Sequence, residues 1–259
     1  MSVIKVGVFD SGIGGLSIAK AIKNQNPSYQ LHYFSDAARH PYGSMNEVEL
    51  LARCERISEF LIEQGCSVIV VACNTATVHT IANLRQKFAV KFVGVEPGVK
   101  PAATSAGESI AIWATENTLK SGQYQFLKQT YGSGRSITDV ACKGLADEIE
   151  LVSAQRGFDS AKLQPFVEQS KRAKCDTIVL GCTHYGLVKT EILQHFSQLN
   201  LQLIDTAEAV AKQACRVAGE SKRTKTTDAF YTSGGVEYFN QQLNHWWPQH
   251  AEVSSQKVI

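Results

Sequence analysis

The 259-residue sequence predicts an α/β protein of two similar domains, each a parallel sheet flanked by helices. Short apolar runs rich in valine and isoleucine, which are typical of strands buried on both faces, alternate with amphipathic stretches of helical period. This strand–helix–strand order favours a parallel sheet with right-handed crossovers. The second half of the chain repeats the same rhythm, which indicates that the two halves have similar folds.

The elements follow one another in a regular order. In the first half, strands are predicted at residues 5–10, 31–36, 67–73 and 91–96, with helices at 16–25, 46–65 and 77–88. In the second half, strands are predicted at residues 109–115, 175–182 and 201–205, with helices between them. The longest helix carries its apolar residues near one face: Val48, Leu51, Ile57, Phe60 and Leu61. Gly65 is suited to end this helix.

Two pairs of predicted strand ends are separated by the same number of residues along the sequence. The separation between Cys73 and Cys182 equals the separation between Glu96 and Asp205. A shared offset at two strand ends indicates duplicated half-molecules. Such halves pack about a pseudo-twofold axis with the carboxyl ends of their strands facing one cleft. We therefore expect Cys73 and Cys182 on opposite walls of an interdomain active site.

Composition and charge exclude several classes of protein. The net charge of +2 is too small to favour a nucleic-acid partner, and the basic run SKRTK at 221–225 is typical of a solvated loop. The apolar runs are far shorter than the ~20 residues of a membrane span. Asp10 interrupts the first apolar stretch, which leaves no room for a signal peptide. The seven cysteines lack metal-ligand spacing, so we expect reduced thiols in a cytoplasmic protein without a bound metal.

Two of the cysteines differ from the others by position. Cys73 and Cys182 each end a predicted strand, where ligands of open α/β sheets bind. Each also precedes a predicted helix, whose N-terminal end favours the thiolate. About 2 kcal/mol from the helix and a polar pocket would lower a thiol pKa from ~8.5 to ~7. The remaining cysteines are expected to be buried packing residues: Cys54, Cys66, Cys142, Cys175 and Cys215.

Polar residues surround the same strand ends. They are Asp10, Ser11, Asn74, Thr75, Thr183 and His184, together with Tyr42 and Gly43 in the turn HPYGS. These groups are suited to hold a small carboxylate or an amino acid. Two thiols on opposite faces of such a ligand match a two-base reaction. One thiol removes a proton from a carbon and the other returns a proton to the opposite face, which inverts the stereocentre.

Six motifs together resemble the glutamate racemases of the aspartate/glutamate racemase superfamily: VFDSGIGGLS, YFSDAARHPYG, VVACNTAT, GVEPG, WATENTLKSGQY and VLGCTHYGL. The resemblance extends from about residue 6 to residue 206, with a weaker match in FYTSGG. It implies interconversion of L- and D-glutamate without a cofactor, supplying D-glutamate for bacterial peptidoglycan. It also implies a homodimer and a two-domain fold in which the C-terminal segment returns to the first domain.

The resemblance further implies a role for each matching residue. Cys73 would act on the α-proton of the D-isomer and Cys182 on that of the L-isomer. Asp10 and His184 would assist their neighbouring thiols. The substrate would be held by Asp10, Ser11, Tyr42, Gly43, Asn74, Thr75, Thr183 and His184. The expected domains are residues 1–98 plus 208–259, which form a discontinuous first domain, and residues 99–207.

The sequence departs from the family pattern at several places. Gly186 follows CTHY where the family commonly has proline, and Ser35 and Ala37 stand where glycine and threonine are usual. The segment ACKGLADEIEL matches poorly, which leaves open whether Glu148 or Glu150 is the family's carboxylate. The chain begins close to its first predicted strand, so we expect no activation of the kind that depends on an N-terminal extension.

Other readings of the same residues stay open. Gly12, Gly14 and Gly15 are a partial dinucleotide-binding turn with Asp36 as ribose ligand, although Ser17 occupies the third glycine position. A hydrolase could use Cys182 with His184 as a nucleophilic dyad, but Cys73 would then have no role. The remaining alternatives are racemisation or decarboxylation of aspartate, and a protein that binds an amino acid without catalysis.

Overall fold

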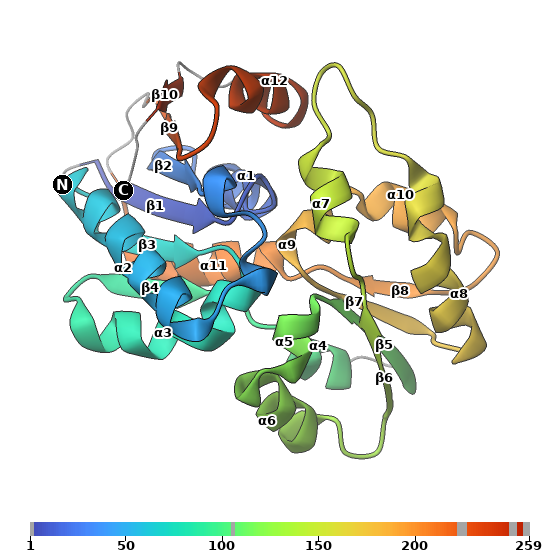
Figure 1. Ribbon diagram of the computed structural model, residues 1–259. Helices are drawn as coiled ribbons and strands as arrows, with labels where there is room; N and C mark the ends of the chain where they lie inside the picture. The colour runs from blue at the N-terminus through green and yellow to red at the C-terminus, as the bar shows by residue number, and fades with distance from the viewer. Residues whose placement is uncertain (1–2, 105–106, 222–226, 249–252, 256–259) are drawn as a thin grey trace.

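The structure, a computed structural model, describes residues 3–104, 107–221, 227–248 and 253–255. Two parallel sheets lie side by side, each covered by helices on both faces (Figure 1), which confirms the predicted α/β fold. Within these ranges, no helix has both the length and the apolar character that crossing a membrane requires. Most of the basic run at 221–225 lies outside the described residues.

The first sheet has the strand order β10-β9-β2-β1-β3-β4, and all its pairings are parallel. Its strands are β1 (Lys5–Asp10), β2 (Gln30–Ser35), β3 (Val68–Val71), β4 (Lys91–Gly94), β9 (Ala229–Thr232) and β10 (Val253–Ser255). At its centre, Gly7 of β1 pairs with His32 of β2 on one side and with Ile69 of β3 on the other. The two last strands of the chain therefore return to the sheet that the first strands build.

Helices cover both faces of this sheet. One face carries α1 (Leu16–Gln25), α11 (Ala207–Ala218) and α12 (Val236–Trp246), and the other carries α2 (Glu47–Glu63) and α3 (Asn74–Lys87). Alternate residues of β3 pack against the helices on opposite faces of the sheet, because successive side chains of a strand point to opposite faces. Val68 and Val70 pack toward α1 and α11, whereas Ile69 and Val71 pack toward α2 and α3.

The second sheet has the order β6-β5-β7-β8. Its strands are β5 (Ser109–Ala114), β6 (Ser136–Ala141), β7 (Thr177–Gly181) and β8 (Gln202–Ile204). One face is covered by α4 (Val99–Ala103), α5 (Glu116–Lys120) and α6 (Gly122–Tyr131), and the other by α7 (Leu145–Glu150), η3 (Ser160–Leu163), α8 (Gln164–Arg172), α9 (Thr183–Leu187) and α10 (Lys189–Gln194). The edge strand β6 was not predicted, because Val140 is its one buried residue and its sequence, SITDVA, contains no continuous apolar run.

The two sheets share one strand order. The order β2-β1-β3-β4 in the first sheet corresponds strand for strand to the order β6-β5-β7-β8 in the second. The strands β3 and β7 are therefore equivalent, and Cys73 and Cys182 are the N-cap residues of the helices that follow them. This agreement supports the duplicated halves inferred from the sequence offset. The domain boundaries near residues 98 and 207 stay a prediction.

The long helix α2 has the expected ends but one unexpected residue. Asn46 caps it by accepting a hydrogen bond from the backbone N–H of Glu49, and Gly65 follows it with a φ of +85°. Ile57 and Leu61 are buried as predicted. The prediction for Val48 is wrong, since this side chain is 80% exposed. It lies two residues before the buried Leu50, and positions two apart on a helix do not share a face.

A buried ion pair fixes the turn that follows β2. The Arg53 guanidinium donates to both carboxylate oxygens of Asp36, at 2.8 and 2.6 Å. The same carboxylate accepts from the hydroxyls of Tyr42 at 2.7 Å and Ser233 at 2.6 Å. Asp36 thereby joins α2, the loop after β9 and two short 3₁₀ turns, η1 (Ala37–Arg39) and η2 (Tyr42–Ser44). Because its carboxylate is buried and fully engaged, Asp36 is not placed to bind a ribose.

We expect Arg53→Met to lower the free energy of unfolding by about 3–5 kcal/mol, because it leaves the buried Asp36 carboxylate without its counter-charge. Urea denaturation followed by circular dichroism measures this change. The matched control is Arg216→Met at an exposed position of α11, which should change the same quantity by less than about 0.5 kcal/mol. Equal unfolding free energies in the two variants would contradict the structural role of the pair.

Candidate active site

The two thiols meet in one narrow cavity between the sheets. Cys73 follows β3 and Cys182 follows β7, and both line a cavity of about 20 Å³. All predicted site residues except Asp10 also line it: Ser11, Tyr42, Gly43, Asn74, Thr75, Thr183 and His184. The structure therefore brings together residues that are far apart in the sequence, at the carboxyl ends of equivalent strands.

Asp10 lies behind the cavity wall and connects its two sides. Its carboxylate is fully buried and accepts a hydrogen bond from the Gly12 N–H at 2.8 Å. It also accepts from the hydroxyl of Thr183 at 2.8 Å and from that of Ser11 at 3.3 Å. Burial raises the pKa of Asp10 to about 6, although His184 nearby and these hydrogen bonds oppose the rise. Asp10 is thus a carboxyl group that can exchange a proton near neutral pH.

Burial raises the pKa of both thiols. For Cys73 the pKa rises to about 12, and for Cys182 it rises as well, with desolvation as the largest cause in each case. Backbone N–H groups at the starts of α3 and α9 oppose this rise, as does the Ser11 hydroxyl beside Cys73. The helix ends act in the expected direction, but the expectation that they and a polar pocket lower the thiol pKa overall is wrong, because desolvation outweighs them. At neutral pH each sulfur carries its proton and needs a neighbouring base.

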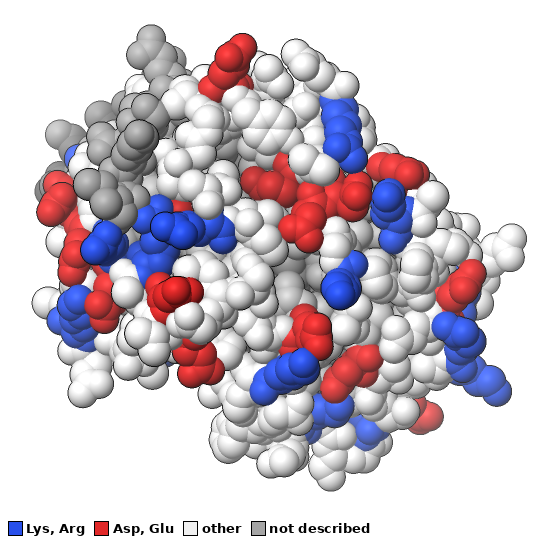
Figure 2. Space-filling model, viewed as in Figure 1, with Lys and Arg blue, Asp and Glu red and all other residues white. Residues whose placement is uncertain are grey.

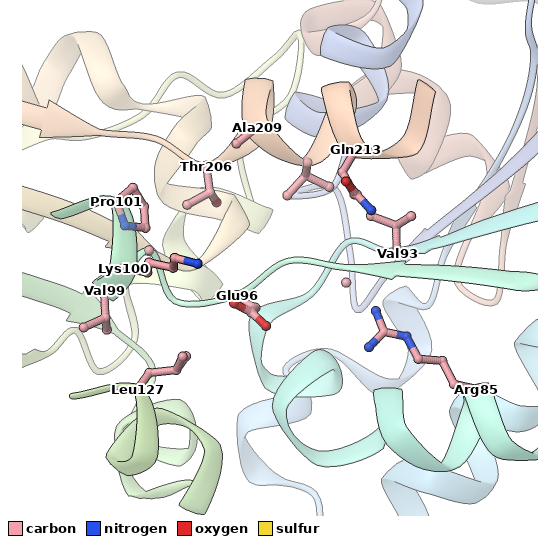
Figure 3. Close-up of a pocket in the computed structure, with 13 residues that line it drawn as sticks. Arg85, Val93, Glu96, Val99, Lys100, Pro101, Leu127, Thr206, Ala209 and Gln213 are labelled. Atoms are coloured by element: carbon pink, nitrogen blue, oxygen red, sulfur yellow. The ribbon is translucent and has the colours of Figure 1, made fainter. Parts of the chain in front are cut away.

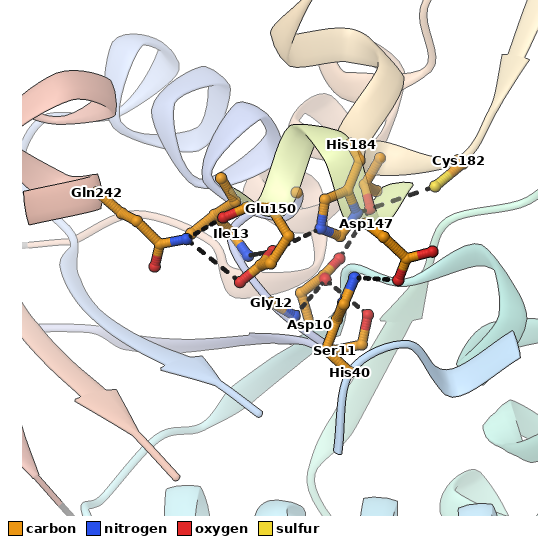
Figure 4. A network of polar contacts seen from close by, with 12 residues as sticks. Asp10, Ser11, Gly12, Ile13, His40, Asp147, Glu150, Cys182, His184 and Gln242 are labelled. Carbon is orange, nitrogen blue, oxygen red and sulfur yellow. Dashed lines mark hydrogen bonds and ion pairs between the residues drawn. The ribbon is translucent and has the colours of Figure 1, made fainter. Parts of the chain in front are cut away.

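His184 connects Cys182 to a buried carboxylate (Figure 4). Its Nδ1 lies 3.9 Å from the Cys182 sulfur, and its Nε2 lies 2.8 Å from Oε2 of Glu150. Burial lowers the pKa of His184 and raises that of Glu150 to about 6. At neutral pH the arrangement fits a neutral imidazole that donates from Nε2 to the Glu150 carboxylate. Its Nδ1 is then the acceptor that faces the thiol.

The structure distinguishes the two glutamates that the sequence left open. We call the first sheet with its helices the first unit, and the second sheet with its helices the second unit. Glu150 is buried, and its Oε2 accepts a hydrogen bond from the Ile13 N–H of the first unit at 2.9 Å. Glu148 instead forms ion pairs at the surface, with Arg156 at 3.1 Å and Lys162 at 3.5 Å. Only Glu150 of this pair contacts His184, so Glu150 is the carboxylate of the site.

Side chains of the second unit pack directly against the glycine turn that follows β1. A Cβ atom on Gly12 would overlap the carboxylate of Glu150, and one on Gly14 would meet Nδ1 of His184 at 2.5 Å. Glycine is therefore required here for the close approach of side chains from α7 and α9. This packing leaves no room for a pyrophosphate at the turn, so the structure does not support the dinucleotide-binding alternative.

Two further polar residues, which the sequence motifs did not single out, also line the cavity. Thr115 follows β5 as Ser11 follows β1, and its hydroxyl lies 3.0 Å from that of Thr75. The internal repeat could have identified Thr115, because its position in the second half of the chain is equivalent to that of Ser11 in the first. His40 lines the cavity from the turn before Pro41, and no sequence signal sets it apart. By contrast, the hydroxyl of Tyr42 donates to Asp36, so Tyr42 offers the cavity its ring and backbone.

The cavity has room for about one water molecule, whose own volume is about 30 Å³. An amino acid therefore requires the two units to separate or the side chains to move. The Oδ1 atom of Asn74 is buried and has no hydrogen-bond partner among the described residues, so it is available to a ligand. A larger cavity of about 330 Å³, lined by Arg85, Glu96, Lys100 and Gln213 among others, contains neither thiol (Figure 3).

Known proteins are similar to this chain in sequence and in fold. A glutamate racemase of Pseudomonas aeruginosa (strain UCBPP-PA14) is 39% identical over 252 residues, which cover 93% of this chain and 93% of that protein. A glutamate racemase of Herpetosiphon aurantiacus is 38% identical over 240 residues, which cover 90% of this chain and 94% of that protein. The crystal structure of Escherichia coli glutamate racemase in complex with L-glutamate and the activator UDP-MurNAc-ala superposes with a TM-score of 0.89 at 27% identity, covering 98% of this chain and 97% of that one.

The pattern of the Asp/Glu/Hydantoin racemase family matches residues 16–214, which include both cysteines and most of the two sheets. The identities above extend over nearly the whole chain. Together with the paired thiols at equivalent strand ends, these matches show that the chain belongs to the Asp/Glu/Hydantoin racemase family.

Proposed function

We propose that this protein is a glutamate racemase that interconverts L- and D-glutamate with Cys73 and Cys182 as its two acid/base groups. The observation that carries the proposal is the placement of these thiols at equivalent strand ends on one cavity. The relatives named as glutamate racemases support glutamate as the substrate. Neither the reaction nor the binding of substrate calls for a cofactor, because side chains supply both proton carriers.

The polar lining of the cavity supports an amino-acid substrate. The unpaired Oδ1 of Asn74 is a ready acceptor for an ammonium group, and the hydroxyl of Thr75 can turn to donate to a carboxylate. The hydroxyls of Ser11 and Thr183 donate to Asp10, so each would have to turn away from it to serve as a donor for the substrate. Removing a proton from Cα creates negative charge that spreads into the α-carboxylate. Donors placed around that carboxylate in a water-poor cavity stabilise this charge and make the Cα–H bond easier to break.

Each thiol has its own route for protons. In the D-to-L direction, the Ser11 hydroxyl lies between Cys73 and Asp10: it takes the Cys73 proton as it gives its own to Asp10. The resulting thiolate then takes the α-proton. Cys182 then gives its proton to the opposite face of the planar carbanion. In the reverse direction, Nδ1 of His184 accepts the Cys182 proton, and the Glu150 carboxylate stabilises the imidazolium that forms. Burial keeps each sulfur protonated until its partner acts.

The family resemblance also supports proposals about the cellular role, the assembly and the domains of the protein. The product D-glutamate would be used in bacterial peptidoglycan synthesis. The protein would act in the cytoplasm and form a homodimer. The domains would divide at residues 98/99 and 207/208, so that the cavity lies between residues 1–98 and residues 99–207.

We expect Cys73→Ala and Cys182→Ala each to reduce racemisation by about 10²–10⁴-fold or more, because each removes one of the two proton carriers. Purified protein is incubated with either enantiomer without added cofactor, and chiral chromatography follows the other. Cys215→Ala, at a half-buried thiol of α11 outside the cavity, is the matched control and should keep full activity.

The racemisation assay, together with melting temperatures measured with and without glutamate, separates the alternatives. A binding protein would give no racemisation in any variant while glutamate still raised its melting temperature. A hydrolase built on Cys182 and His184 would depend on Cys182 and not on Cys73. Full activity in Cys73→Ala would therefore contradict the two-thiol mechanism.

We expect kcat/KM to rise with pH through about 6, because burial raises the pKa of both Asp10 and Glu150 to about 6. Below this pH the carboxyl groups are neutral and cannot receive or stabilise a proton; above it they are ionised. Both must be ionised in one turnover, Asp10 to receive the Cys73 proton and Glu150 to hold the His184 tautomer that faces Cys182. The logarithmic slope therefore approaches about two on the acid side. Steady-state kinetics between pH 4 and pH 8 (about two units on either side) measure this slope.

Glu150→Gln removes one of these groups, so its residual activity should show a slope of about one. Glu148→Gln is the matched control and should keep the wild-type profile, because that carboxylate pairs with surface cations. A profile that is identical in wild type and Glu150→Gln would contradict the role assigned to Glu150.

A further inference from the structure

Three nitrogen and oxygen donors converge beside the Cys182 thiol. They belong to His40, Glu150 and His184, each of which offers one atom, and these atoms all lie within 4.8 Å of one another. Figure 4 shows the side chains approaching from separate elements. His40 comes from the turn between η1 and η2 of the first unit, whereas Glu150 and His184 come from α7 and α9 of the second. We refer to these three residues as the His–Glu–His cluster.

His40 is the member whose ring nitrogens have the fewest partners. Its side chain is 8% exposed, and neither ring nitrogen makes a hydrogen bond to the described residues. Among the described residues its partner is the Asp147 carboxylate, whose Oδ1 lies 3.4 Å from Nε2 and pairs with the ring when the ring is protonated. Its ring lies beside that of His184, with 5.0 Å between the centroids. A buried imidazole with no hydrogen-bonded partner is costly, which points to a ligand that the ring can bind.

The donor set fits a zinc ion. Imidazole and carboxylate donors are typical of Zn²⁺, whose ligand atoms lie about 2.0–2.2 Å from the metal and hence about 3.3 Å from one another in a tetrahedron. The Glu150 and His184 donors are 2.8 Å apart, and all three donors lie within 4.8 Å of one another. Binding an ion therefore requires the Glu150 and His184 atoms to move slightly apart and the three donors to turn toward one point. Acidic side chains gather on the surface over α7, where Asp147 and Glu148 lie (Figure 2), and this charge favours a cation.

We propose that the His–Glu–His cluster is an inhibitory site for a divalent transition-metal ion, with Zn²⁺ as the ion it fits best. Binding replaces the proton shared by His184 and Glu150, so these side chains can no longer serve Cys182. It also ties His40 of the first unit to the second unit, which holds the cavity closed to substrate. The inhibition rests on the proposed racemase function, whereas the binding of the ion does not.

Binding is tested with the full-length chain in a thiol-free reductant, titrated with zinc chloride in a calorimeter. We expect one ion per chain, and at least about tenfold weaker binding in His40→Gln. His195→Gln, at a partly exposed histidine of the second unit, is the matched control and should bind as the wild type does. Equal affinity in His40→Gln and wild type would overturn the proposal.

Two measurements on the unmodified chain guard against a variant that folds poorly. Bound Co²⁺ should give tetrahedral visible bands without the charge-transfer absorption of a thiolate ligand. Added Zn²⁺ should shift the ring resonances of His40 and His184 in NMR spectra and leave those of His195 in place. A thiolate band, or loss of binding when the cysteines are alkylated, would place the ion on the catalytic thiols and overturn the proposal.

Inhibition is measured separately, as racemisation with and without the ion. Wild-type activity should fall at least about tenfold at saturating Zn²⁺ and return when a chelator is added, and His40→Gln should need at least about tenfold more ion for the same loss. If the ion binds to the cluster but the chain racemises nothing, the racemase function fails while the metal site stands. If the chain racemises glutamate and the cluster binds no ion, the metal site fails alone.

Discussion

The contact between the Glu150 carboxylate and the glycine turn after β1 determines how the two sheets meet. Gly12 leaves room for that carboxylate, and the N–H of Ile13 binds it at 2.9 Å. This contact brings His184 against Gly14 and thereby places Cys182 on the same cavity as Cys73. A side chain at Gly12 would push the second unit away and separate the thiols. The geometry of the site therefore depends on the absence of a Cβ atom at Gly12 and at Gly14.

Burial at this junction governs the chemistry of the site. Desolvation keeps both sulfurs protonated at neutral pH, and it moves the pKa of Asp10 and Glu150 to about 6, where they can still ionise. Each thiol is thus paired with a group that can receive its proton. The same closure makes the cavity too small for an amino acid, which links substrate binding to movement of the two units.

Much of this arrangement follows from the sequence. The rest depends on how deeply side chains are buried and on how the helices are oriented. Buried parallel strands have continuous apolar runs, so β1, β3 and β7 were recognisable, whereas the polar edge strand β6 was not. The offset between Cys73 and Cys182 predicted the shared cavity because equivalent strands end on one cleft. The direction of the thiol pKa shift was predicted wrongly, since sequence shows the helix start and not the desolvation. The choice of Glu150 over Glu148 needed the orientation of α7.

The fate of the α-hydrogen tests the two-thiol account most directly. In deuterated water, the conversion of D-glutamate is stopped long before equilibrium is reached. Mass spectrometry and NMR then measure the deuterium content at Cα of both enantiomers. The account predicts that the L-glutamate formed carries solvent deuterium, because the proton it receives comes from Cys182, while the remaining D-glutamate keeps its original hydrogen. L-glutamate that retains the hydrogen of the substrate would contradict it, since one base would then have carried the same proton from one face to the other.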